Sequence, residues 1–113
     1  NNLENNLKNF KNRNTYFKIT SELFFLKNKQ YFDVIYIDGW HGTAQVAKDI
    51  SNSWKILNIG GIIICDDYFY GDIYKNLDKN IPAPAINKFI KENIKKLKII
   101  CVNNNQIFLK KIK

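Results

Sequence analysis

Residues 32–41 read FDVIYIDGWH, and residues 60–67 read GGIIICDD. Each stretch contains a continuous apolar run, which is typical of a β-strand covered on both faces by helices. The first run ends at Asp38, and the second ends at Asp66 and Asp67. Because open α/β sheets bind ligands outside the carboxyl ends of their strands, we expect these acids to lie where a ligand would bind.

The composition indicates one globular domain. The chain has 113 residues, of which 45% are hydrophobic, and this length accommodates one domain at most. The formal net charge of +8 is compatible with an anionic partner such as nucleic acid. We favour a small-molecule partner instead, since the lysines are scattered and a nucleic-acid-binding face needs clustered charge with interleaved aromatics. No run of about 20 apolar residues occurs, so we expect no membrane partner and a cytoplasmic protein.

The spacing of apolar and turn-forming residues predicts alternating helices and strands. Helices are expected at residues 3–11, 21–27, 43–57 and 82–94, and strands at residues 15–20, 33–38, 62–66, 98–102 and 106–111. Thr43 is a candidate cap for the third helix, and Gly60-Gly61 would stop that helix. Residues 68–80 show no sustained period and are expected to form a loop over the site. This order predicts an α/β fold, a three-layer α/β/α sandwich that ends in an antiparallel hairpin.

The two acid-ended stretches resemble those of the class I S-adenosylmethionine-dependent methyltransferases, in particular the small-molecule O-methyltransferases of methyltransferase family 24. That family has an FDLIFIDGDH strand and a PGGxxxxDD strand, to which residues 32–41 and 60–68 are similar. Residues 81–89 resemble a later family helix, with Ala85 and Phe89 in place. The resemblance implies a Rossmann-like sheet and covers roughly residues 2–111.

The family's glycine-rich cofactor loop has no counterpart, because no GxGxG occurs in this chain. The resemblance places that loop, and the acid that ends the family's second strand, before residue 1. Residues 1–113 are therefore expected to form a single partial methyltransferase domain, its carboxyl-terminal part. The family strands that would flank residues 32–38 and 15–20 are also missing. An unpaired apolar edge is an aggregation hazard, so the chain is a fragment, a member of a homo-oligomer or other assembly, or a rearranged sheet.

Asp38, Asp66 and Asp67 are the central candidate site. Carboxylates that converge repel each other unless a cation lies between them, and Mg²⁺ is satisfied by carboxylate and water oxygens. In the cation-dependent O-methyltransferases that the sequence resembles, the metal ligands fall at these positions. Such a metal would hold the acceptor and lower the pKa of its hydroxyl. The alternative is that the acids cap turns or shape the cleft without metal; we favour the metal.

Three further residues lie close to these acids in the sequence. His41 is the only histidine, and its ordinary pKa suits a general base working beside Asp38; a loop histidine without a role is the alternative. Trp40 stands where the family more usually has Asp and could supply an aromatic wall for the acceptor. Tyr68 could line the same pocket, although core packing explains both aromatics equally well.

Ser21 and Glu22 align with a family segment in which an acid can contact the adenine of the cofactor, so the resemblance assigns them to cofactor binding. Thr20 stands in place of that acid, and capping of a helix by Ser21 is the alternative.

The resulting hypothesis is methyl transfer from S-adenosylmethionine to a hydroxyl oxygen of a small-molecule acceptor, with Mg²⁺ as the candidate metal. The rival hypothesis is a catalytically incompetent fragment that acts only by association with another chain, and the isolated chain is expected to be inactive. Methylation of nucleic-acid bases is disfavoured, because residues 65–68 read CDDY where those enzymes carry an Asn-Pro-Pro-Tyr type of motif.

Overall fold

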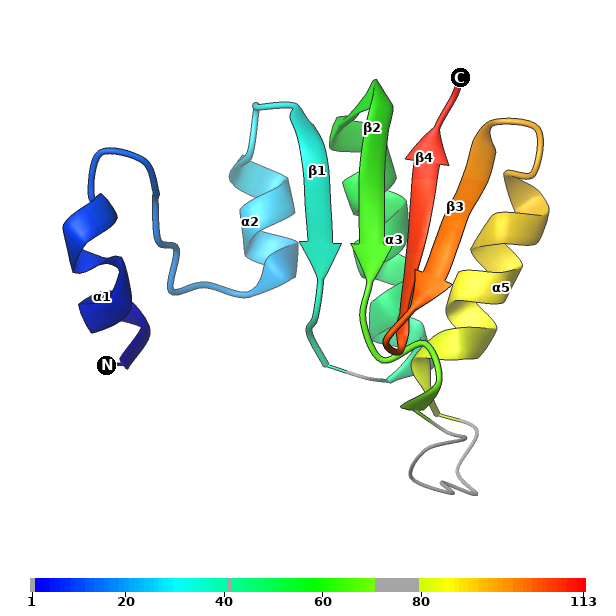
Figure 1. The fold of residues 1–113 in the computed structure, drawn as a ribbon, viewed down its shortest axis with the longest axis horizontal. Helices are drawn as coiled ribbons and strands as arrows, with labels where there is room; N and C mark the ends of the chain where they lie inside the picture. Colours follow the sequence, from blue (N-terminus) through cyan, green and yellow to red (C-terminus); the bar gives the residue numbers. More distant parts are fainter. Residues whose placement is uncertain (1, 41, 71–79) are drawn as a thin grey trace.

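A computed structural model of the chain describes residues 2–40, 42–70 and 80–113. The helices are α1 (Asn2–Leu7), the 3-10 helix η1 (Lys8–Phe10), α2 (Ser21–Lys27), α3 (Thr43–Ile56) and α5 (Pro82–Glu92). The strands are β1 (Phe32–Ile37), β2 (Leu57–Cys65), β3 (Leu97–Asn103) and β4 (Gln106–Lys111). Together they form a four-stranded sheet in the order β1-β2-β4-β3, with helices packed beside it (Figure 1).

The sheet is parallel at one edge and antiparallel at the other. β1 pairs parallel with β2, and its last pair joins Ile37 to Cys65. β4 runs antiparallel to β2 and to β3, which confirms the predicted terminal hairpin. The carboxyl ends of β1 and β2 therefore meet at one end of the sheet, next to the tip of the hairpin (Figure 1). The predicted α/β fold class is confirmed.

The core lies between the sheet and the helices α3 and α5. Alternate strand residues point toward these helices, so Ile63 and Leu109 are fully buried against Ile50 and Ile86. On the opposite face of the sheet, Val34 is 58% exposed. Within the described residues, helices thus form one layer on the sheet, and the second helical layer of a three-layer sandwich is not among them.

β1 lies at the edge of the sheet, with α2 and residues 14–20 on its outer side (Figure 1). Residues 15–20 do not form a strand, so that prediction was wrong. An extended segment becomes a strand only when its backbone groups bond to a neighbouring strand, and no described strand lies beside this one. Among the described strands, β1 pairs only with β2.

Two predictions about α3 were also wrong. Thr43 is the first residue of the helix rather than its cap, and its Oγ1 donates a hydrogen bond of 2.7 Å to the carbonyl oxygen of Ile81. The helix ends before Leu57, where the chain passes directly into β2, and Gly60-Gly61 lie inside that strand. A Cβ on Gly61 would lie 2.8 Å from the carbonyl oxygen of Asp33, so the second glycine permits close approach to β1.

No helix in the described part of the chain has the length and apolar character needed to cross a membrane.

Candidate functional site

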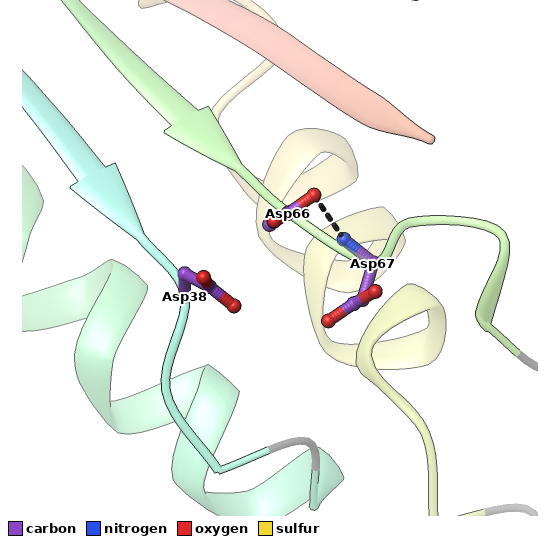
Figure 2. Close-up of side chains that lie close together, drawn as sticks. All are labelled: Asp38, Asp66 and Asp67. Carbon is purple, nitrogen blue, oxygen red and sulfur yellow. Dashed lines mark hydrogen bonds between the residues drawn. The ribbon is translucent and has the colours of Figure 1, made fainter. Parts of the chain in front are cut away.

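The three predicted acids lie together at the carboxyl ends of β1 and β2. Asp38 follows β1, and Asp66 and Asp67 follow β2 (Figure 2). The backbone N–H of Asp66 donates a hydrogen bond of 3.0 Å to the carbonyl oxygen of Ile37, which places the ends of the two strands side by side. One carboxylate oxygen from each acid lies within 4.8 Å of the others. Parallel pairing therefore brings together acids that are far apart in the sequence.

The chemistry of this cluster fits a hard divalent cation. Three carboxylates at this separation repel each other in the absence of positive charge, and Mg²⁺ prefers oxygen ligands of this kind, completing its shell with water. Asp38 is exposed, and Asp66 and Asp67 are half-buried, so water reaches the cluster. Three converging oxygen donors with access for water are what an octahedral cation needs.

Tyr36 contacts the cluster from the exposed face of β1. Its hydroxyl donates a hydrogen bond of 2.5 Å to Asp66 Oδ2 and accepts one of 3.0 Å from Nε2 of Gln106. The hydrogen bond to Asp66 is the main cause that raises the pKa of Tyr36 to about 12 from 10.0, because the carboxylate stabilises the protonated phenol. Tyr36 therefore remains a donor to the acid cluster at neutral pH.

A groove of about 790 Å³ runs along the unpaired edge of β1 toward these acids. Its walls are mainly apolar and include Phe17 and Phe24 from the α2 side and Val34 from β1. The polar groups along it include Asp38 and Ser21. The acid cluster and the start of α2 thus share one groove.

The family described as a methyltransferase domain matches residues 2–68, which is more than half of the 113 residues. The chain belongs to this methyltransferase family. No curated protein matches it.

Solved structures resemble this methyltransferase chain in fold. The O-methyltransferase NovP superposes with a TM-score of 0.65 at 14% identity, over 98% of this chain and 44% of NovP. PaMTH1 of Podospora anserina, bound to SAH, superposes with a TM-score of 0.65 at 15% identity. The match covers 96% of this chain and 54% of the PaMTH1 chain. MycE, in complex with Mg, SAH and mycinamycin VI, superposes with a TM-score of 0.55 at 18% identity. The match covers 71% of this chain and 25% of the MycE chain. The chain spans about half or less of the length of these structures.

Ser21 does not cap α2 in the methyltransferase chain. Thr20 is the cap, and its Oγ1 accepts a hydrogen bond of 3.3 Å from the backbone N–H of Leu23. Ser21 instead donates a hydrogen bond of 2.8 Å to Asp49 Oδ1. Glu22, the other residue predicted to bind cofactor, forms an exposed ion pair of 3.8 Å with Lys48. Of the two, only Ser21 lines the groove.

The remaining predicted site residues lie in different surroundings. His41 lies outside the described residues, as do residues 71–79 of the predicted loop. Trp40 is 75% exposed and does not line the groove. Tyr68 packs against the core, and its hydroxyl donates a hydrogen bond of 2.6 Å to Asn87 Oδ1 in α5.

Sequence reasoning missed several residues around the site. Asp49, only 7% exposed, lines the groove next to the segment after Asp38, since a Cβ on Gly39 would lie 3.6 Å from its Oδ2. Its position on the inward side of α3 was the available signal, because a buried carboxylate requires partners. Three other residues contact the acids or one another: Tyr36, Asn105 and Gln106. These contacts join residues that are far apart in the chain, so the sequence did not predict them.

Proposed function

We propose that the domain containing this chain transfers a methyl group from S-adenosylmethionine to a hydroxyl oxygen of a small-molecule acceptor. Asp38, Asp66 and Asp67 would hold a divalent cation that binds this acceptor. The observation that carries the proposal is the convergence of three carboxylate oxygens within 4.8 Å at the carboxyl ends of neighbouring parallel strands. Membership of the methyltransferase family supports the reaction class, and the presence of Mg and SAH in the MycE complex supports the cation and the cofactor.

The acids would act by binding and orienting the acceptor. A bound cation would supply positive charge that lowers the pKa of the acceptor hydroxyl. His41, three residues after Asp38, is proposed to accept the proton of that hydroxyl. The acceptor oxygen then forms its bond to the methyl carbon as the bond from that carbon to sulfur breaks, and S-adenosylhomocysteine leaves with the sulfur electron pair.

The cofactor is proposed to lie in the groove beside β1, which Ser21 lines. Glu22, the second predicted cofactor contact, adjoins Ser21 in the chain but does not line this groove. Support comes from Ser21 and Asp38, which line the same groove. Trp40 and Tyr68 remain predicted acceptor contacts. A single partial domain over residues 1–113 and a cytoplasmic location also stay predictions.

The rival proposal is a fragment without catalytic activity that acts by association. The exposed apolar residues and unpaired edge of β1 favour it, because such edges pair with other chains. The two proposals differ in the role of the three acids. In the first they bind a cation, whereas association with another chain requires no cation.

Binding of Mn²⁺ tests the proposed function directly. We expect Mn²⁺ to broaden the NMR signals of residues around Asp38 and Asp66 in the 113-residue chain, and Mg²⁺ to compete for the same site. Asp66→Ala should abolish this broadening. Asp33→Asn is the matched control, because Asp33 lies at the opposite end of β1 and bonds to Asn58. Equal broadening in the wild type and Asp66→Ala would remove the cation site from the proposal.

A further inference from the structure

The tip of the β3–β4 hairpin is bonded to the turn that carries Asp66 and Asp67. Asn105 makes three hydrogen bonds to this turn. Its carbonyl oxygen accepts from the N–H of Tyr68 at 2.9 Å, its Oδ1 accepts from the N–H of Phe69 at 2.5 Å, and its Nδ2 donates to Asp67 Oδ1 at 3.2 Å. One side chain therefore fixes both the backbone of the acid turn and one of its carboxylates.

The backbone of Asp67 needs such support. Asp67 has φ 56°, in the left-handed region that a non-glycine residue rarely adopts. Backbone conformations of this kind persist when surrounding contacts hold them in place. The hydrogen bonds of Asn105 to the next two residues, Tyr68 and Phe69, supply that restraint.

A second connection runs from the hairpin to Asp66. Gln106 Nε2 donates to the hydroxyl of Tyr36, and this hydroxyl donates to Asp66 Oδ2. Asp66 Oδ1 accepts from the backbone N–H of Asp67 at 3.0 Å. Because a donor approaches each oxygen of Asp66, rotation of its carboxylate is restricted.

We propose that Asn105 and Gln106, at the tip of the β3–β4 hairpin, are positioning residues that hold Asp67 and Asp66 in the geometry that binds the cation, with Gln106 acting through Tyr36. This inference rests on the proposed function. Like charges would otherwise drive the carboxylates apart, so donors from the hairpin reduce the cost of bringing them together. Partners of metal ligands typically contribute 10–100-fold to metal affinity.

Asn105→Gly tests the inference. Glycine keeps the positive φ of 64° and the backbone carbonyl at this position, and removes only the carboxamide. Asn104→Gly is the matched control, since Asn104 has φ 49° in the same turn and, within the described residues, its side chain has no hydrogen bond to the turn that carries Asp66 and Asp67. Calorimetry should show Mn²⁺ affinity about 10–100-fold weaker in Asn105→Gly and unchanged in Asn104→Gly. Tyr36→Phe should weaken affinity in the same range, and Gln106→Ala should do so less.

A second measurement separates this inference from the proposed function. Side-chain couplings in NMR report the χ1 rotamer of Asp67 without metal, and we expect one rotamer in the wild type and averaging in Asn105→Gly. Averaging in the variant supports the positioning role even if the wild type binds no Mn²⁺, in which case the proposed cation site is what fails. If the wild type binds Mn²⁺ and Asn105→Gly matches it in affinity and in the Asp67 rotamer, the positioning role is overturned while the cation site stands.

Discussion

Ser21 Oγ lies 2.8 Å from Asp49 Oδ1, across the 28 residues that separate the start of α2 from the middle of α3. Gln45 Nε2 donates to the same carboxylate oxygen at 3.0 Å. A carboxylate that is only 7% exposed is costly unless donors of this kind surround it. The Ser21–Asp49 hydrogen bond therefore connects α2 to α3, beside the groove proposed to bind the cofactor.

Ser21→Ala should lower the free energy of unfolding by about 1–2 kcal/mol, because Asp49 loses the hydrogen bond from Ser21 and keeps the one from Gln45. Denaturant titration followed by circular dichroism measures this change. Ser51→Ala is the control, since Ser51 is an exposed residue of the same helix, α3. Equal stability of both variants would show that the Ser21–Asp49 hydrogen bond contributes nothing.

Tyr36 should titrate later than an ordinary tyrosine, with a folded pKa of about 12 rather than 10.0. Ultraviolet absorbance of tyrosinate measures it, as the difference between the wild type and Tyr36→Phe. The folded pKa is raised, so the stability contributed by the Tyr36–Asp66 hydrogen bond is fully present below pH 10.0 and is lost as the pH rises through about 12. Asp66→Asn should move the pKa of Tyr36 back toward 10.0, and an unmoved pKa would show that Asp66 is not the cause.

The isolated 113 residues should bind S-adenosylmethionine weakly or not at all. The chain contains no GxGxG motif, and backbone amides of such a loop are the groups expected to meet the cofactor. Isothermal titration calorimetry checks this expectation. Micromolar affinity would mean that the groove beside β1 binds the cofactor by itself.

His41→Ala, made in the complete domain, should lower kcat by about 10²- to 10⁴-fold, as loss of a general base does. Activity should recover in part at high pH, where the acceptor hydroxyl ionises without a base. Loss of a mere loop contact would raise KM instead. If His41→Ala kept the wild-type kcat at neutral pH, His41 would not be the base. Proton removal would then fall to Asp38 or to the lowered pKa of a cation-bound acceptor hydroxyl.

The strands of this protein could be predicted from the sequence where apolar runs were long and bounded by acids or turns. β1 and the β3–β4 hairpin were expected within one or two residues of their observed bounds. Residues 15–20 have the same local character, yet they form no strand, since strand formation depends on a neighbour. Gly60-Gly61 look like a helix stop in the sequence. In the structure, Gly60 has φ 86° and a Cβ on Gly61 would lie 2.8 Å from the carbonyl oxygen of Asp33, so each position favours glycine for a reason that the sequence does not show.

The sequence by itself determined that Asp38, Asp66 and Asp67 end two apolar strands, because runs of apolar residues followed by acid can be recognised locally. The expectation that helices cover both faces of these strands was wrong for β1, which has no buried residue. Their separation within 4.8 Å was decided by tertiary structure, through the parallel pairing of β1 with β2. The contact of Asn105 with Asp67 was likewise decided only by folding, since it joins residues 38 positions apart in the chain. Local patterns predict elements, whereas the partners of a polar side chain depend on which elements the sheet places side by side.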